Sequence, residues 1–531
     1  MVDTKKEQER DELHRAIWAI ADELRGAVDG WDFKNYVLGT MFYRYISENL
    51  CSYINSGEAK AGNADFDFAK MPDEDAEEAR DGLVEEKGFF ILPSELFCNV
   101  RANAANDENL NETLERVFRH IEESAKGSEA ESDFAGLFDD YDVNSNKLGS
   151  TVAKRNEKLV KLLNGVGEMN LGDVKDHSID AFGDAYEYLM TMYASNAGKS
   201  GGEFFTPADV SELLTRLGTV GKTEINKVYD PACGSGSLLL KAEKILGKDA
   251  IRNGFYGQEI NITTYNLCRI NMFLHDVGFD KFDIACEDTL ISPQHWDDEP
   301  FELIVSNPPY SIKWAGNENP LLINDPRFAP AGVLAPKSKA DMAFIMHSLS
   351  WLASNGTAAI VCFPGIMYRG GAEQKIRKYL IDNNYVDCVI QLPGNLFFGT
   401  SIATCIMEMK RNKADNKTLF IDATGECIKV TNNNRLTLEN IERIVDVFTK
   451  REEVKYFAHL ASYEEVSGND YNLSVSTYVE ARDTREKIDI VKLNVEIKEI
   501  VAREQVLRDE IDKIIAEIED RREDELLDEV R

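Results

Sequence analysis

Apolar residues recur at helical spacing through the first third of the chain. They include Leu13, Ile17, Ile20 and Leu24, and later Leu110, Leu114, Val117, Phe118 and Ile121. Steps of three and four residues place such side chains on one face of a helix. The pattern predicts helices over residues 5–55, with a break at Gly30, and again over 83–165. The polar, acidic stretch 56–82 predicts a loop between them. Residues 1–165 are therefore expected to form a mostly helical domain.

From residue 166 onwards, short apolar runs alternate with helical patterns. The runs that predict strands are 225–230, 254–259, 282–288, 301–305, 357–363, 386–392 and 403–409. Helical patterns separate several of them, as at 238–246, 341–353 and 373–383. Strands that alternate with helices are typical of a doubly wound, mainly parallel sheet. We therefore expect an α/β fold with a Rossmann-like seven-stranded sheet in a domain spanning residues 166–480.

The end of the chain has a third pattern. Its apolar positions are Ile490, Leu493, Ile497, Ile500, Leu507, Ile511, Ile514 and Ile518. Their spacing alternates between three and four and is interrupted only at Glu504, which is a heptad seam. The pattern predicts a coiled-coil-like helix in a C-terminal region, residues 481–531. Such a helix either packs on its own domain or joins a partner.

Length and charge narrow the choice of function. A chain of 531 residues exceeds what one hydrophobic core usually holds, so two or three domains are expected. The formal net charge is −34, and an acidic chain is a poor unaided ligand for nucleic acid. If the substrate is DNA, a partner or a local basic patch must supply much of the affinity.

The nine cysteines are scattered, with no CxxC pair and no His/Cys cluster of metal-binding spacing. This distribution predicts reduced thiols in the cytosol, no structural zinc and no metal in the site. The first residues lack the apolar stretch of a signal peptide, and no apolar run is long enough for a transmembrane helix. A cytoplasmic protein without a membrane partner is expected.

Polar side chains close four of the predicted strands. These residues are Asp230, Glu259, Asp288 and Asn307. A polar residue at the end of one strand is ordinary. Four in succession fit a parallel sheet whose carboxyl edge binds ligands, because the carboxyl ends of parallel strands lie along one edge.

The first of these ends opens a glycine-rich turn, Asp-Pro-Ala-Cys-Gly-Ser-Gly-Ser at 230–237. The turn lacks the lysine of a phosphate-binding loop, so Asp230 is expected to meet a cationic amine. Gly234 and Gly236 let the backbone approach a ligand closely. A ligand with an amino-acid end is favoured over a pyrophosphate. Glu259, 29 residues later, suits ribose hydroxyls, and Asp288 can accept from an adenine amine.

The stretch Asn307-Pro308-Pro309-Tyr310 ends the strand at 301–305. Proline stiffens the backbone, so the Asn307 carboxamide oxygen and the Pro308 carbonyl can converge on one point beside the Tyr310 ring. Two fixed acceptors and an aromatic face suit a nucleobase amine. The alternative is a strand that ends in a proline turn, with Tyr310 as packing.

A further stretch, Gly-Gly-Glu-Phe-Phe-Thr-Pro, lies at 201–207. Thr206 and Pro207 predict a helix start, because threonine suits the N-cap and proline the first turn. The stretch is either a capped helix after a flexible loop or a segment that closes over a small ligand.

Together these motifs resemble the amino-methyltransferases that act on adenine N6 in DNA. With the helical N-terminal domain, the chain resembles the modification subunit of type I restriction–modification systems nearly from end to end. The resemblance implies S-adenosylmethionine as cofactor and an antiparallel last strand. It places Glu203, Phe204, Phe205, Thr206 and Pro207 over the cofactor, and Asp230, Ala232, Gly234, Ser235, Gly236 and Ser237 at its methionine end. Glu259 would hold its ribose and Asp288 its adenine, while Asn307, Pro308, Pro309 and Tyr310 would hold the target base. Ser237 stands where some relatives carry another glycine.

The resemblance also implies partners. A specificity subunit that contacts the C-terminal end would read double-stranded DNA for the complex, and a second modification subunit and a restriction (nuclease and translocase) subunit could join. The glycine- and proline-rich stretch 311–339 is long for a structureless loop, which indicates function or ordering on binding. The alternatives are a methyltransferase for protein glutamine or RNA, and a non-catalytic assembly subunit.

Overall fold

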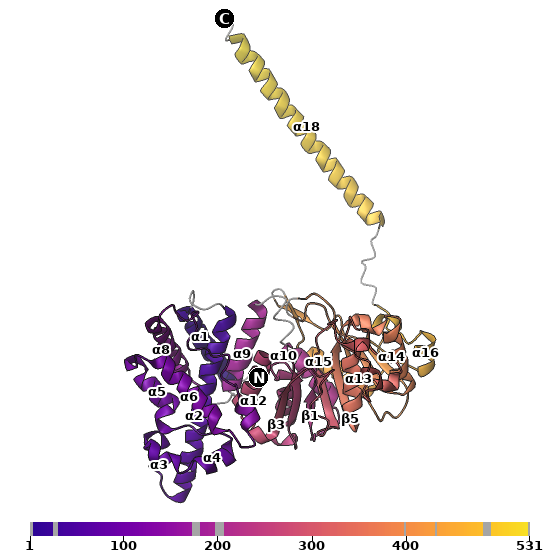
Figure 1. Cartoon of the computed structure of the whole chain (residues 1–531). Helices are drawn as coiled ribbons and strands as arrows, with labels where there is room; N and C mark the ends of the chain where they lie inside the picture. The colour runs from indigo at the N-terminus through magenta and orange to yellow at the C-terminus, as the bar shows by residue number, and fades with distance from the viewer. Residues whose placement is uncertain are drawn as a thin grey trace. The chain divides into compact units, whose positions relative to one another are not determined.

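The computed structural model describes residues 4–24, 30–171, 181–196, 206–397, 400–430, 433–481 and 490–528. The chain divides into two compact units, Met1–Glu480 and Ala481–Arg531. Figure 1 follows the elements of both units along the sequence. Among the described residues, none of the helices combines the length and apolar character that crossing a bilayer requires.

The first described residues, up to 171, form the helical part of the larger unit, as the sequence predicts. Its helices are α1 Thr4–Leu24, α2 Gly30–Ala61, α3 Asp73–Glu77, α4 Arg80–Lys87, α5 Phe97–Asn103, α6 Leu110–Ser124, α7 Glu131–Phe134 and α8 Val152–Glu168. The predicted loop at 56–82 is wrong in part, because α2 continues to Ala61 and α3 lies within the stretch. Burial of Ala76 explains how so polar a segment keeps a helix.

The sheet part follows. Its strands are β1 Val228–Asp230, β2 Phe255–Glu259, β3 Phe282–Cys286, β4 Phe301–Ser306, β5 Leu352–Cys362, β6 Val386–Gln391, β7 Cys405–Lys410, β8 Thr418–Asp422 and β11 Ala458–Ala461. They form one sheet in the order β11-β8-β6-β7-β5-β4-β1-β2-β3. All seven predicted strands are present. β8 and β11 extend the sheet beyond β6 and were not expected.

Strand directions match those of a doubly wound sheet. β4 pairs in parallel with β1 and β5, and β1-β2-β3 are parallel to one another. β7 runs antiparallel to both β5 and β6, as the resemblance implied. The carboxyl ends of β1 to β4 therefore lie along one edge of the sheet.

Helices cover both faces of this sheet. They are α9 Ala181–Asn196, α10 Ala208–Thr219, α11 Ser237–Leu246, α12 Ile262–Leu274, α13 Asp341–Trp351, α14 Ala372–Asp382, α15 Leu438–Lys450, α16 Tyr463–Gly468 and α17 Val475–Tyr478. Along β4, Leu303 and Val305 join the core that contains α10 and α12, and Ile304 joins the core that contains α13. Burial on both faces explains why the strand is a continuous apolar run rather than an alternating one.

The helical part shares a core with the sheet part. Arg269 on α12 is 1% exposed, and its guanidinium donates to the carbonyls of Ser132 and Ala135 at 2.7 and 3.0 Å. Thr263 Oγ1 also donates to Asp140 at 2.9 Å. These contacts join the helical part to the helix that follows β2.

In the smaller unit, residues 490–528 form the helix α18 Ile490–Asp528. The predicted seam residues from Ile490 to Ile518 are all exposed, between 44% and 70%.

Candidate active site

Three of the four predicted strand-end residues lie at, or one residue beyond, the carboxyl ends of adjacent strands. Asp230 is the last residue of β1 and lies beside Gly257 of β2, whose last residue is Glu259. Asn307 directly follows β4, on the other side of β1. Asp288 comes two residues after β3 ends at Cys286. The sheet thus brings these polar groups to one edge.

Asp230 is a buried carboxylate, 1% exposed. Its Oδ1 accepts a hydrogen bond from the Ala232 amide at 3.0 Å. Burial raises the pKa of Asp230 to about 7, and the nearby Glu259 carboxylate adds to the rise. No Lys or Arg of the described residues forms an ion pair with Asp230, so a cationic ligand would supply the missing charge compensation.

The turn after β1 needs its glycines. Gly234 has φ +55° and Gly236 φ +78°, in the left-handed region that disfavours residues with a Cβ. A Cβ on Gly236 would lie 2.7 Å from the Cys268 Sγ atom. Ser235 and Ser237 follow the turn with their hydroxyl oxygens 3.3 Å apart, and Ser237 begins α11. Gly236 is therefore required by the close packing of this turn against α12.

Glu259 ties this turn to the next strand end. Its Oε2 accepts from the Gly234 amide at 3.1 Å, and its Oε1 from the Asn261 amide at 2.8 Å. Burial raises the pKa of Glu259. The two backbone bonds fix the carboxylate and leave it further lone pairs for hydroxyl donors.

Asp288 forms a turn at the end of β3. Its Oδ1 accepts from the amides of Leu290 and Ile291 at 2.9 and 3.3 Å. The next residue, Thr289, donates its hydroxyl to the Pro231 carbonyl at 2.6 Å. Asp288 is therefore connected through its neighbour to the turn that starts at Asp230.

Asn307 is held by two hydroxyl groups. Its Nδ2 donates to Thr206 Oγ1 at 3.1 Å, and its Oδ1 accepts from the Tyr310 hydroxyl at 2.5 Å. Pro308 is buried, and the half-buried Tyr310 ring lies edge-on to Phe397, with centroids 6.5 Å apart. Burial raises the pKa of Tyr310 well above its ordinary value, so the phenol stays neutral.

Thr206 does not cap the helix as predicted. Helix α10 begins at Ala208 with Pro207 as its N-cap residue, one position later than expected. The Thr206 hydroxyl contacts Asn307 instead, a contact across 101 residues that no local pattern reveals. Glu203, Phe204 and Phe205 lie outside the described residues.

The residues present fit an S-adenosylmethionine site. Its ammonium would compensate the buried Asp230 carboxylate, and its ribose hydroxyls can donate to Glu259.

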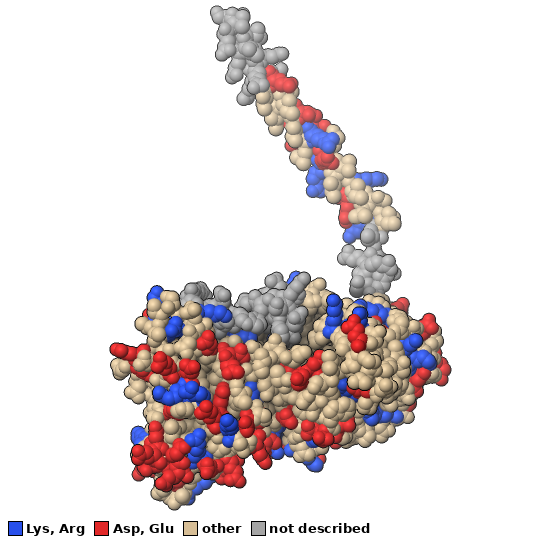
Figure 2. Space-filling view, viewed as in Figure 1, with Lys and Arg blue, Asp and Glu red and all other residues tan. Residues whose placement is uncertain are grey.

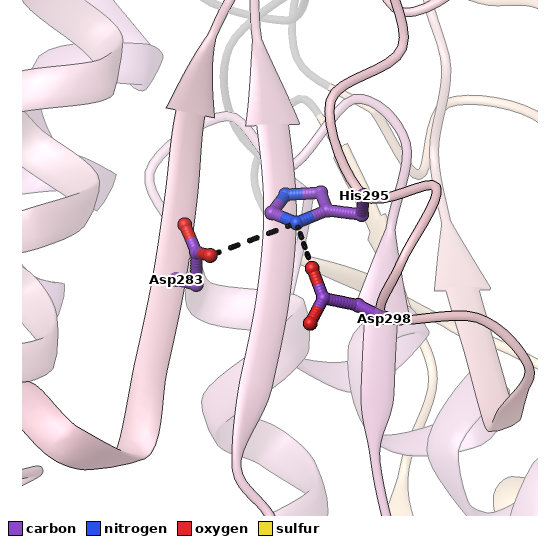
Figure 3. A group of neighbouring side chains, drawn as sticks. All are labelled: Asp283, His295 and Asp298. Atoms are coloured by element: carbon purple, nitrogen blue, oxygen red, sulfur yellow. Dashed lines mark hydrogen bonds and ion pairs between the residues drawn. The ribbon is translucent and has the colours of Figure 1, made fainter.

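A separate group of ligand-type side chains comprises Asp283 on β3 and two residues of the β3–β4 connection, His295 and Asp298. The His295 Nδ1 atom lies 3.0 Å from Asp298 Oδ2 and 3.9 Å from Asp283 Oδ2. Figure 3 shows both carboxylates turned toward the His295 ring. The Nε2 atom of His295 donates to the Gly257 carbonyl at 2.9 Å.

A lysine shares this group. The Lys227 amine donates to the Asp298 carbonyl at 2.7 Å and lies 4.0 Å from the Oδ1 atom of its carboxylate. An ammonium there competes with a metal ion for the same carboxylate. We therefore assign His295 a structural role: its hydrogen bond to the Gly257 carbonyl fixes the β3–β4 connection to β2.

The charge on the surface is uneven. Figure 2 shows acidic side chains gathered on the helical part around α3 and α4. The exposed acidic residues there are Glu74, Asp75, Glu77, Glu78, Asp81, Glu85 and Glu86. This surface repels a phosphate backbone and is unsuited to contact with DNA.

Sequence comparisons place these observations in a family. The N-6 DNA methylase family profile matches residues 177–487, and the HsdM N-terminal domain profile matches residues 13–166. A type I restriction enzyme methylase subunit of Mycoplasma pneumoniae is 49% identical, over 97% of this chain and 98% of its own length. One from Methanocaldococcus jannaschii is 30% identical, over 96% of this chain and 85% of its own length.

Comparison with solved structures agrees with the sequence comparisons. The methyltransferase subunit of a type I restriction–modification system from Streptococcus thermophilus superposes with a TM-score of 0.79 at 36% identity. The match covers 89% of this chain and all of that one. A modification subunit of a type I restriction enzyme from Vibrio vulnificus shares the fold, with a TM-score of 0.58 at 17% identity, over 87% of this chain and 93% of its own.

Proposed function

The chain belongs to the N-6 DNA methylase family as an adenine-specific methyltransferase subunit of the type I restriction–modification class, and we propose that it takes its methyl group from S-adenosylmethionine and its target sequence from a specificity subunit. One observation carries the proposal for the site. The Asn307 amide lies one strand from Asp230, so acceptors for a base amine and a carboxylate for a ligand ammonium share one sheet edge.

The target amine needs help from the protein. Adenine N6 is a weak nucleophile because its lone pair is delocalised into the ring. The base must also leave the duplex, at a cost of a few kcal/mol. In our proposal the Tyr310 ring stacks on the flipped base, while Asn307 Oδ1 and the Pro308 carbonyl accept the two N–H groups. Accepting both hydrogens favours the more tetrahedral nitrogen that attacks.

The remaining residues align the reactants. When bound, S-adenosylmethionine supplies an electrophilic methyl group, so the protein has to provide position and electrostatic complementarity. Asp230 would pair with the ammonium, Glu259 would accept from the ribose and Asp288 from the adenine amine. Thr206 would hold the Asn307 amide in the orientation that presents Oδ1.

The net charge of the chain and the exposed apolar seam of α18 both support a specificity subunit as partner. A chain with net charge −34 is repelled by DNA at long range, so a specificity subunit has to bring the two together. The exposed apolar seam of α18, from Ile490 to Ile518, is the surface proposed to bind that subunit. The neighbouring Arg508 and Glu504 form an ion pair at 2.8 Å along the helix.

The test is a methyl-transfer assay with the complex of this chain and its specificity subunit. Radiolabelled S-adenosylmethionine is offered with genomic DNA, with total RNA and with a protein extract. We expect label in DNA only, as N6-methyladenine at one recurring sequence in single-molecule sequencing. Label in protein or RNA would support the corresponding alternative, and no label in any substrate would support a non-catalytic assembly role.

A further inference from the structure

One buried arginine lies in the long loop that follows the Asn307–Tyr310 motif. Arg327 is 1% exposed, and its guanidinium donates to the backbone carbonyls of Thr289 at 2.7 Å and Leu290 at 2.8 Å. It also forms a forked pair with the Asp325 carboxylate, with Nε at 3.0 Å and Nη2 at 2.8 Å. A buried arginine satisfied in this way is fixed in position.

The two carbonyls belong to the turn of Asp288. We call residues 288–291 the adenine turn, because Asp288 is the residue proposed to meet the cofactor adenine. The amides of Leu290 and Ile291 donate to Asp288 Oδ1. They belong to the same two peptides whose carbonyls accept from Arg327, so these peptides connect the guanidinium to the carboxylate. Thr289 also bonds the Pro231 carbonyl, next to Asp230.

On its other side Arg327 reaches the sheet. Its Nη1 lies 3.1 Å from His347 Nδ1, and His347 Nε2 lies 2.9 Å from the Tyr229 hydroxyl. A guanidinium can only donate, so Nδ1 accepts and Nε2 carries the proton. Burial holds the pKa of His347 well below its ordinary value, which keeps the ring neutral for this role. Tyr229 immediately precedes Asp230.

The loop itself depends on these contacts. Residues 311–339, here called the target loop, contain only short 3₁₀ helices, η7 Gly316–Glu318, η8 Leu322–Asn324 and η9 Ala329–Ala331. The loop begins directly after Tyr310, and its Phe328 is buried against Trp314, with ring centroids 5.5 Å apart. Arg327 contributes the charged anchor of this packing, with its guanidinium 4.7 Å from the Phe328 ring.

We propose that Arg327 is a positioning residue that couples the adenine turn to the target loop, so that cofactor binding at Asp288 stiffens the chain on the target-base side. The inference rests on the proposed function, because it takes the cofactor and base sites from there. It adds a direction of communication, from cofactor to base, through the two carbonyls that a single guanidinium holds.

Hydrogen–deuterium exchange of the full-length protein tests the coupling without any activity. In the wild type, saturating S-adenosylmethionine should slow exchange in both the adenine turn and the target loop. In Arg327→Lys and Arg327→Met the cofactor should still slow exchange in the adenine turn. Its effect on the target loop should be lost, and the affinity for cofactor should fall about tenfold, as expected for losing hydrogen bonds to a buried charge.

A second buried arginine provides the matched control. Arg377 is also 1% exposed and donates to the carbonyls of Ile366 and Tyr471, both at 2.8 Å. Arg377→Lys should lower the melting temperature in the same way as Arg327→Lys, yet keep the cofactor-dependent protection of the target loop. Loss of that protection in both variants would mean a general loss of stability and would overturn the coupling.

Two other outcomes are decisive. Unchanged cofactor-dependent protection of the target loop in both Arg327 variants would overturn the proposal. Failure of the wild-type protein to bind S-adenosylmethionine would instead contradict the proposed function. In the assembled complex, the fluorescence of 2-aminopurine at the target position reports base flipping. For the wild type, this fluorescence should increase more with cofactor than without it. For Arg327→Lys, the increase should be the same with and without cofactor.

Discussion

The Tyr310 hydroxyl lies 2.5 Å from the Asn307 Oδ1 atom, the same oxygen that is proposed to accept the target amine. A carboxamide oxygen has two lone pairs, so one remains for a second donor. Without a base, the Tyr310 hydroxyl thus occupies one lone pair of Asn307 Oδ1. The Thr206 hydroxyl accepts from the Nδ2 atom of the same carboxamide. The first two predictions follow from this pair.

Asn307→Ala removes one of the two proposed acceptors of the amine. Methyl transfer should fall at least ~100-fold, as when one preorganised polar group is removed from a transition state. Cofactor affinity should stay unchanged. The control is Asn355→Ala, which removes an exposed amide that bonds Glu302 at the opposite end of the strands. Near-normal turnover of the Asn307 variant on cognate DNA would contradict the assignment.

The two variants of Tyr310 separate its ring from its hydroxyl. Tyr310→Phe keeps the stacking face and releases Asn307 Oδ1, so most of the activity should remain. Tyr310→Ala should lose ~1–3 kcal/mol of base binding, the usual value for an aromatic platform. The measurement is the KM for DNA together with 2-aminopurine fluorescence. An equal loss in both variants would show that the hydroxyl matters and that stacking is the wrong explanation.

Cofactor binding should depend on pH through Asp230. The pKa of this buried carboxyl is raised to about 7, and the ionised form is the one that pairs with an ammonium. The Kd for S-adenosylmethionine should therefore rise about tenfold between pH 8 and pH 6, as the protonated fraction grows. Isothermal titration across this range is the measurement, and Asp230→Asn should bind weakly with a flat profile.

The same substitution should raise the stability of the ligand-free protein. The folded-state pKa of Asp230 lies above the ordinary value of 3.8, so ionisation opposes folding at pH values above about 7 and does so less as the pH falls. Asp230→Asn removes this penalty, and its melting temperature at pH 8 should exceed that of the wild type. A lower melting temperature would contradict the raised pKa.

Gly236→Ala should damage the cofactor turn. The new Cβ would sit at φ +78° and 2.7 Å from Cys268 Sγ, so both backbone strain and a clash are introduced. We expect a loss of at least ~1 kcal/mol of stability and weaker cofactor binding. Gly425→Ala is the control, because its Cβ would meet nothing within 4 Å. The measurements are the melting temperature and the cofactor Kd of both variants.

The α18 seam should be required for assembly. Ile511→Asp places a charge on the seam, and Ala516→Asp places the same charge on the opposite side of the heptad. Only the first should weaken co-purification with the specificity subunit and abolish sequence-specific methylation. Cutting the chain after Thr484 should act in the same way and leave cofactor binding intact. Normal assembly by the truncated chain would contradict the prediction, as would tight sequence-specific DNA binding by the isolated full-length chain.

Local sequence patterns were enough to predict the strand ends, the order of the motifs and the α18 seam. Each of these depends on neighbours a few residues apart, and periodicity and turn chemistry report such neighbours directly. Asp230, Glu259 and Asn307 could be placed on one sheet edge for this reason. The strands β8 and β11 were not predicted from the sequence.

Which side chains meet depends on how distant segments of the chain pack together. Thr206 looks like a helix cap in the sequence, yet its hydroxyl holds Asn307, 101 residues away. Arg327 stands in a stretch without any period, and it anchors that stretch to carbonyls 37 and 38 residues earlier in the chain. Such contacts depend on how the loops fold back over the sheet edge, which is set by packing and by the satisfaction of buried polar groups rather than by local pattern.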